Sequence, residues 1–243
     1  MATLTRKQRE IAAREEQILD VAQRLLLERG YHGLTMDRIA TAIDYSKGTV
    51  YQHFQNKEDL LVAVMMRSCT TRLALFERAA TFRGSARERM TAIGVAVELF
   101  HHLYPHFEQI ESLLRSDSLR ARASETRLGA LEAVEARSLD ICFGITRDAV
   151  ASGDLALPDG YPLQDVTMGL WSLFQGTFDI VARHLPYERL GLSDPLEVLW
   201  RSASALLDGC GWRPLSTELD YDAVRERVHA EVFAEERRRA DRG

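Results

Sequence analysis

The chain has 243 residues, of which 46% are hydrophobic and 28% charged, and its net charge at neutral pH is -5. This composition is typical of a soluble globular protein and excludes a disordered chain. No apolar run approaches the roughly 18 residues that a membrane-spanning helix needs, so we expect no membrane contact. Charged residues follow the basic N-terminus where a signal peptide would have its apolar stretch, which predicts a cytoplasmic protein.

Three cysteines, Cys69, Cys142 and Cys210, are isolated from one another and form no CxxC pair. Isolated cysteines fit a reducing compartment. We therefore expect three small buried side chains and not a redox switch.

Helical periodicity runs through the chain, and no segment alternates as a strand would. The first helix has one apolar stripe, formed by Ile11, Ile18, Ala22 and Leu25. We expect this helix to end at Gly30, because glycine readily takes the left-handed conformation that closes a helix. Two short helices should begin after Thr35 and Ser46, and Asn56 can cap a fourth.

The rest of the chain predicts further helices over about 90–104, 107–114, 128–152, 162–184 and 195–209, and an amphipathic tail helix from Glu218 whose end, residues 235–243, should be frayed. A glycine-containing loop at 81–85 is expected to mark the domain boundary. The predicted fold is all-α. Residues 1–67 form a three-helix helix-turn-helix unit, and residues 68–243 form a larger helical bundle.

The third short helix has a polar outer face. If Val50 and Phe54 point into the three-helix unit, donors and one aromatic ring turn toward solvent, with no acidic residue between Ser46 and Asn56. Such a surface suits a DNA groove, where lysine and glutamine can meet base edges and an aromatic ring can meet a thymine methyl. Helix starts also favour phosphate. The predicted DNA-contacting residues are Thr35, Ser46, Lys47, Gly48, Thr49, Tyr51, Gln52, His53 and Lys57.

The alternative is a three-helix core whose outer face is simply solvated. The basic residues Arg6, Lys7, Arg9 and Arg14 leave two possibilities open, an arm that enters the adjacent groove or a disordered start. The net negative charge does not exclude DNA, because residues 1–67 hold ten Lys or Arg against nine Asp or Glu, and contact depends on the local field.

These residues resemble the N-terminal signature of the TetR family of bacterial transcriptional regulators, densely over residues 16–65. The matching positions are Thr35, Ile39, Ala40, Ala42, Ser46, Gly48, Thr49, Tyr51, Phe54, Lys57 and Leu60. Beyond residue 80 the resemblance is only architectural. It implies a two-fold dimer, a recognition helix in the major groove and an effector pocket in the C-terminal domain. By the same resemblance, Lys47, Tyr51 and Gln52 contact bases, whereas Thr35, Thr49, His53 and Lys57 contact mainly phosphate.

One position departs from the family pattern. Asp44 stands where the family usually has a glycine in the turn between the second and third helices. Aspartate tolerates left-handed geometry better than most residues, so we expect the turn to survive at modest cost. An acid beside DNA either lowers affinity or accepts a hydrogen bond from a cytosine amino group.

The C-terminal region is rich in large apolar side chains, with a few polar residues that can supply specific contacts. Most must form an ordinary helical core, but some are expected to surround a cavity for a small apolar effector. The candidate ligand-binding residues are Phe100, Leu103, Phe107, Leu114, Arg137, Phe143, Arg147, Met168, Trp171, Phe174, Gln175 and Phe178, together with Asp179.

Small residues repeat at helical spacing after Pro162, and apolar residues surround them. A four-helix interface between two subunits would bury this face, although packing within one chain is the alternative. The predicted interface consists of Gly169, Ser172, Leu173, Gly176, Leu199, Trp200, Ala203 and Leu206, with Leu196 beside them.

Histidines at 101, 102 and 106 suggest a metal site only weakly, because Pro105 interrupts the spacing and no second ligand pair follows. The sequence has no nucleophile paired with a base, no phosphate-binding loop and no zinc signature, so we expect no cofactor and no enzyme. The predicted function is a homodimeric repressor that an apolar small molecule releases from inverted-repeat DNA. A constitutive DNA-binding protein and an all-helical enzyme remain the alternatives.

Overall fold

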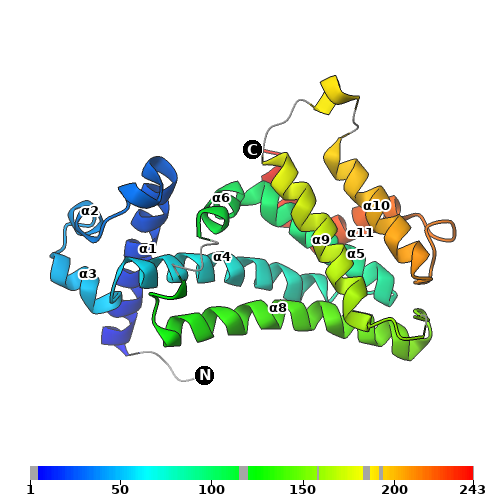
Figure 1. The fold of residues 1–243 in the computed structure, drawn as a ribbon, viewed down its shortest axis with the longest axis horizontal. Helices are drawn as coiled ribbons and strands as arrows, with labels where there is room; N and C mark the ends of the chain where they lie inside the picture. Colours follow the sequence, from blue (N-terminus) through cyan, green and yellow to red (C-terminus); the bar gives the residue numbers. More distant parts are fainter. Residues whose placement is uncertain (1–4, 115–119, 158, 183–186, 192–193, 243) are drawn as a thin grey trace. The chain divides into compact units, whose positions relative to one another are not determined.

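The computed structural model describes residues 5–114, 120–157, 159–182, 187–191 and 194–242, and every regular element in these ranges is a helix (Figure 1). The all-α prediction is confirmed. The helices are α1 Arg6–Gly33, α2 Met36–Ala42, α3 Lys47–His53, α4 Lys57–Ala79, α5 Ala86–Leu103, α6 Pro105–Leu114, α8 Glu125–Ser152, α9 Leu163–Val181, α10 Pro195–Gly209, α11 Tyr221–Glu231 and α12 Ala234–Ala240, with a 3-10 turn at Tyr187–Leu190. Over the described residues, no helix is long and apolar enough to cross a bilayer.

Side-chain caps begin the short helices where the sequence predicts them. The Thr35 hydroxyl accepts from the Arg38 amide at 3.3 Å, and the Ser46 hydroxyl accepts from the Thr49 amide at 3.1 Å. Asn56 caps α4 in the same way, through the amide of Asp59 at 2.7 Å. Each cap satisfies a backbone donor that the helix itself cannot pair.

The first helix changes direction at Gly30, which has φ 65° and ψ -175°. α1 therefore contains a long straight helix up to this glycine and one further turn to Gly33. The predicted end at Gly30 is the position of this kink. A side chain at Gly30 would be strained, because L residues rarely adopt this φ.

Contacts divide the chain into two compact units. The first comprises residues 1–71 and 104–136, and the second comprises residues 72–103 and 137–243. Both α4 and α8 run from one unit into the other. The loop at 81–85, which the sequence predicts as the domain boundary, lies inside the second unit, which begins at residue 72. α6 and the first turns of α8 belong to the first unit, because α6 packs on α1 and Arg127 of α8 binds Asp59 and the His53 carbonyl.

The first unit has one apolar core shared by its short helices. Side chains that are at most 1% exposed come from α1 to α4 and the segment between them: Ile18, Ala22, Leu26, Leu34, Ile39, Val50, Phe54, Leu60 and Leu61. Helices of seven residues are unstable alone in water. Their orientation therefore depends on this core.

The second unit is built around α5, against which α9, α11 and α12 pack, while α10 packs on α9 (Figure 1). Arg87 of α5 is 1% exposed and donates to Asp208 at 2.6 Å and to the carbonyls of Trp212 and Pro214 at 2.5 and 2.9 Å. This buried arginine ties α5 to the end of α10 and to the segment that leads into α11.

The tail is an ordered helix and not a frayed end. Phe233 is fully buried, and the carboxylate of Glu236 pairs with Arg78 of α4, whose guanidinium also lies 5.0 Å from the Phe233 ring. These contacts hold α12 in place. The prediction that the chain frays from residue 235 was therefore wrong for the turns up to Ala240.

Candidate DNA-binding interface

The two faces of α3 differ as the sequence predicts. Val50 and Phe54 are fully buried in the first unit. Lys47, Tyr51 and Gln52 are exposed on the opposite side, and Tyr51 retains 43% of its accessible surface. Gly48 is also exposed, and a Cβ there would lie 3.7 Å from the Ser46 hydroxyl. A cation, a phenol and an amide thus share one accessible helical face.

Lys47 has an internal partner on the preceding helix. Its Nζ lies 2.8 Å from a carboxylate oxygen of Asp37 and 5.8 Å from the centre of the Tyr51 ring. The hydrogen bond and the charge of Asp37 raise the pKa of Lys47, so the ammonium form is stabilised. Sequence reasoning did not single out Asp37, although an acid in the first turn of α2 is visible as a negative charge near this face.

The turn between α2 and α3 has the left-handed backbone conformation that was expected at Asp44, the residue that replaces the usual glycine. Asp44 has φ 56°, which lies in the left-handed region. The following amide, of Tyr45, donates to the carbonyl of Ala40 at 3.0 Å. The Arg14 guanidinium lies 5.0 Å from the centre of the Tyr45 ring. Asp44 therefore preserves the tight turn and is itself exposed.

Two of the residues predicted to contact phosphate have internal partners in the structure. The His53 side chain is 7% exposed, and its Nδ1 lies 3.9 Å from a carboxylate oxygen of Glu15. Lys57 donates to the carbonyl of Tyr31 and lies 3.7 Å from the centre of that ring. Burial lowers the pKa of Lys57. Neither side chain faces solvent freely, because tertiary packing gives each an internal partner.

The remaining predicted contacts lie at helix starts. The Thr49 hydroxyl is 2.9 Å from the hydroxyl of Ser46, so both groups are engaged in the cap of α3. Thr35 is exposed and caps α2. Their backbone amides and hydroxyls are placed where helix starts favour phosphate.

The basic N-terminus is not an extended arm over the residues described. Thr5 forms a capping box with Gln8, and the helix begins at Arg6, which pairs with Glu10 at 2.8 Å. The expectation of an arm or of a disordered start was wrong from residue 6 onward. The cap explains the difference, since it stabilises the first turn of α1.

The candidate ligand-binding residues are divided between the two units and differ in burial. Phe100, Phe174 and Phe178 are buried in the second unit, where Phe178 stacks on His101 with ring centres 3.7 Å apart. Phe107 belongs to the first unit. Leu103 and Phe143 are half-buried, Gln175 donates to Asp179 at 3.1 Å, and the side chain of Leu114 lies outside the described residues.

Four further candidates for ligand binding are exposed in this chain. Met168 and Trp171 are 45% and 48% exposed on α9. Arg137 is exposed and pairs with Glu77 of α4 at 2.5 Å, and Arg147 is also exposed. Helical periodicity predicted α8 and α9, on which these four residues lie, but it did not show which faces of the two helices the rest of the chain covers.

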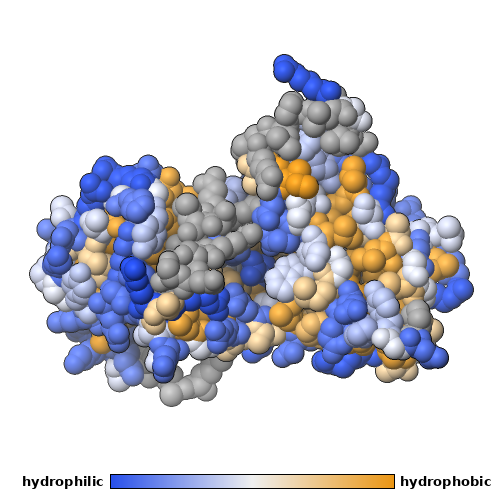
Figure 2. Space-filling model, in the orientation of Figure 1, coloured by the Kyte–Doolittle hydropathy of each residue, from blue (hydrophilic) through white to orange (hydrophobic). Residues whose placement is uncertain are grey.

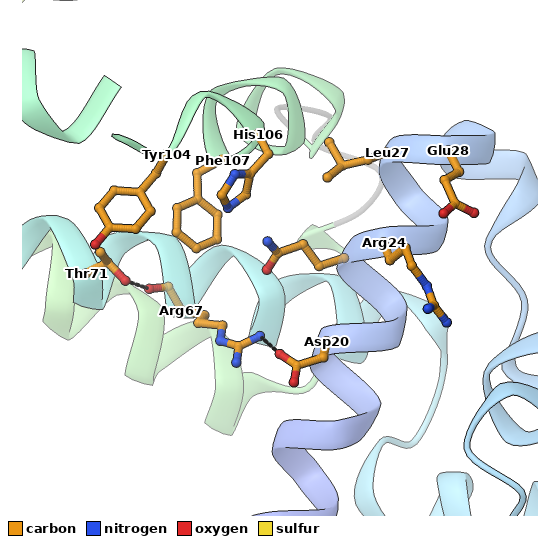
Figure 3. Close-up of a pocket in the computed structure, with 10 residues that line it drawn as sticks. Asp20, Arg24, Leu27, Glu28, Arg67, Thr71, Tyr104, His106 and Phe107 are labelled. Atoms are coloured by element: carbon orange, nitrogen blue, oxygen red, sulfur yellow. Dashed lines mark hydrogen bonds and ion pairs between the residues drawn. The ribbon is translucent and has the colours of Figure 1, made fainter. Parts of the chain in front are cut away.

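An open groove of about 660 Å³ lies within the first unit, between α1, α4 and α6 (Figure 3). Tyr104, which precedes α6, and His106 and Phe107 of α6 face the groove, and on the other side Arg67 pairs with Asp20 at 2.6 Å. Burial and the nearby charge of Arg67 lower the pKa of His106. Among the described residues, no cluster of His, Cys, Asp or Glu could hold a metal ion.

The predicted dimer interface divides into two sets. Leu199 and Ala203 are buried within the chain, and Trp200 donates to Glu98 at 2.8 Å. At Gly169 a Cβ would lie 3.2 Å from Leu206, so this glycine allows α9 and α10 to approach within one chain. These residues pack inside the protomer, as the alternative interpretation held.

The second set stays accessible. Gly176 has open space where a Cβ would lie, Ser172 is exposed, and Leu173 is half-buried. Around them lie the exposed apolar side chains of Met168, Trp171, Ile180 and Val198. Figure 2 shows hydrophobic side chains over the region of α9 and α10.

The comparisons with known proteins agree with this geometry. Residues 18–64 match the family model described as bacterial regulatory proteins, tetR family. The transcriptional activator FasR of Mycolicibacterium smegmatis is 34% identical over 96 residues, which are 40% of this chain and 42% of that protein. The fatty acid metabolism regulator protein of Bacillus subtilis is 24% identical over 177 residues, 68% of this chain and 87% of that protein. The alignment with the first of these relatives thus spans less than half of its length.

Solved structures extend the likeness to most of the chain. A TetR/AcrR-family regulator from Thermobifida fusca is 25% identical with a TM-score of 0.59, covering 81% of this chain and 98% of that one. The regulator FadR from Bacillus subtilis, solved with stearoyl-CoA, is 20% identical with a TM-score of 0.58, covering 80% and 98%. Helix-turn-helix, turn geometry and fold agree: residues 18–64 match the TetR family of bacterial regulatory proteins, and most of the chain has the fold of solved TetR-family regulators.

Proposed function

We propose that the chain is a dimeric transcriptional repressor that binds an inverted-repeat operator through α3 and is released by an apolar small molecule. The observation that carries the proposal is the division of α3 into a buried face and an exposed face. Val50 is fully buried, while Lys47, Tyr51 and Gln52 remain accessible on a helix short enough to enter a major groove. Curated relatives are regulators of the same helix-turn-helix type.

The dimer is supported by the apolar face of α9 and α10. Met168 and Trp171 of α9 and Val198 of α10 are each more than 40% exposed, and a Cβ at Gly176 of α9 would meet open space. Exposed apolar patches mark interaction sites, and a two-fold dimer presents two identical recognition helices. Inverted-repeat DNA follows from that symmetry.

The effector is proposed to be a molecule with a long acyl chain. The fatty acid metabolism regulator of Bacillus subtilis points this way, and FadR from the same organism was solved with stearoyl-CoA. Such a ligand acts only if it binds one arrangement of the two DNA-binding units better than the other. A coupling of about 1–3 kcal/mol would change operator affinity about 5- to 150-fold. The protein is proposed to have no catalytic activity.

Selection of bound duplexes from a random pool tests the DNA-binding part. We expect an inverted repeat, and a pool that stays random would contradict the proposal. Stearoyl-CoA, stearate and free CoA are then added to the protein on the selected duplex. Release by the acyl compound but not by free CoA supports an acyl effector. Selected DNA that none of the three releases would favour a constitutive DNA-binding protein, and a reporter gene separates repression from activation.

A further inference from the structure

Arg127, in the first turn of α8, lies at the centre of a cluster that joins three elements of the helix-turn-helix. Its Nε donates to Asp59 of α4 at 3.0 Å, and its Nη2 donates to the carbonyl of His53 at 2.9 Å and to Glu15 of α1 at 3.3 Å. The guanidinium also lies 4.5 Å from the centre of the Phe54 ring. The side chain is 19% exposed, so these contacts are largely shielded from water.

Asp59 requires such a partner. Its side chain is 3% exposed. Its carboxylate accepts hydrogen bonds from the amide and the hydroxyl of Ser124 at 3.2 and 2.6 Å, and from the amide of Gln55 at 3.4 Å. Burial acts to raise the pKa of Asp59, but the hydrogen bonds from Ser124 and the charge of Arg127 outweigh it, so the pKa is lowered. A buried carboxylate that stays ionised is costly without a cation beside it.

Arg127 binds the backbone carbonyl at the end of α3, the helix that is proposed to contact DNA. His53 is the last residue of α3, and the carbonyls of a final helical turn have no partner within the helix. A cation there also interacts favourably with the helix dipole. Because α3 has seven residues, its orientation is set by contacts at its ends and on its buried face.

We propose that Arg127 is a positioning residue, which holds the end of α3 against α1 and α4 at the orientation that sequence-specific binding requires. The proposal rests on the proposed DNA-binding function. Arg127 belongs to α8, which continues to Ser152 in the second unit. An arginine fork suits this role better than lysine, because it can serve two or three acceptors at once.

The test compares three variants of the full-length protein. Arg127→Met keeps the aliphatic stem and removes the guanidinium, and Arg127→Lys keeps the charge and loses the fork. Arg120→Met is the matched control, because Arg120 forms an exposed pair with Glu132 at 3.1 Å in the same unit. Each variant is titrated with the duplex selected by the wild type and with a scrambled duplex, and its melting temperature is measured.

We expect Arg127→Met to lose about 10- to 100-fold in affinity for the selected duplex, with a much smaller loss on the scrambled one. The salt slope should stay within about one unit of the wild type, because phosphate contacts are retained. Arg127→Lys should be intermediate, and the control should match the wild type. Hydrogen exchange of the free protein should quicken at residues 50–56 and stay unchanged in α9.

Equal discrimination by Arg127→Met and the control would overturn the proposal. So would equal losses on both duplexes with faster exchange throughout the first unit, since Arg127 would then serve folding only. A wild type that binds no DNA selectively would refute the proposed function instead. In that case the exchange measurement still decides whether Arg127 orders the end of α3.

Discussion

Neutralising one acid on the DNA-facing side should strengthen DNA binding. Asp37 pairs with Lys47 at 2.8 Å, so the wild type must give up this ion pair before the ammonium can contact DNA. Asp37→Asn frees Lys47 and removes a carboxylate that repels phosphate. The same change lowers protein stability slightly, because Asp37 lies in the first turn of α2 and favours the helix dipole. Asp37→Asn is thus expected to raise the affinity for DNA and to lower the stability of the protein.

The expected gain in operator affinity is small, because the side chains of Lys47 and Asp37 are both exposed. The two side chains are 54% and 66% exposed, and exposed ion pairs stabilise proteins weakly. Operator affinity should therefore rise only about two- to five-fold. A freed lysine should steepen the salt slope by up to about one unit. Loss of the dipole interaction, about 0.3–1 kcal/mol, should lower the melting temperature by roughly 1–4 °C in a protein of this size.

Fluorescence anisotropy on the selected duplex at several salt concentrations measures the gain, and a thermal melt measures the cost. Glu132→Gln is the matched control, since it neutralises an exposed carboxylate that pairs with Arg120, away from α3. We expect the control to bind like the wild type. The reasoning is refuted if Asp37→Asn binds more weakly than the wild type, or if the control gains as much.

Three further predictions concern the second unit and the core. Gly176→Leu should leave monomer stability unchanged, because a Cβ there meets open space, but should yield monomers in light scattering; a persistent dimer would place the interface elsewhere. Arg87→Met should lower the free energy of unfolding in urea by about 3–5 kcal/mol, since it removes the buried guanidinium that pairs with Asp208 and binds the carbonyls of Trp212 and Pro214. Hydrogen bonds from Ser216 and Arg87 hold the pKa of Asp208 below its usual value despite burial, so the carboxylate is ionised near neutral pH and the ion pair stabilises the fold there. Below about pH 4 the carboxylate becomes protonated, and the difference in free energy of unfolding between Arg87→Met and the wild type should become smaller. Phe54→Ala, which empties a fully buried site, should cost about 3–5 kcal/mol, and a loss below about 1 kcal/mol would contradict the shared core of the first unit.

Local chemistry explains which parts of the fold were predictable. The starts of α2, α3 and α4 follow from Thr35, Ser46 and Asn56, because a cap involves a side chain and an amide two or three residues ahead. Asp44 could be placed in the turn for the same reason, since its backbone preference is local. The all-α fold followed from periodicity alone.

Partners distant in sequence explain the errors. Lys57 was assigned to phosphate from its place at a helix start, but it binds the carbonyl of Tyr31, 26 residues away. The tail was expected to fray because nothing in its composition shows that Glu236 meets Arg78, 158 residues away. Arg127 gives no local signal either, because its partners on α1, α3 and α4 are brought to it only by folding.

The interface residues show a further limit. The sequence assigns Leu199 of α10 to the dimer interface and Trp171 of α9 to the ligand site. Spacing cannot tell which of these faces the same chain buries and which it leaves exposed. The packing of α10 on α9 determines which face is buried, because it covers Leu199 and leaves Trp171 48% exposed.

The central claim is that the exposed face of α3 recognises base sequence. Its most direct test is the affinity of the wild type, Lys47→Ala and Tyr51→Ala for the selected duplex and for a scrambled duplex of equal composition. We expect the wild type to prefer the selected duplex clearly, and each substitution to lower this preference about 5- to 150-fold while scarcely changing affinity for the scrambled duplex. Equal wild-type affinity for both duplexes, or an unchanged preference in both variants, would contradict it.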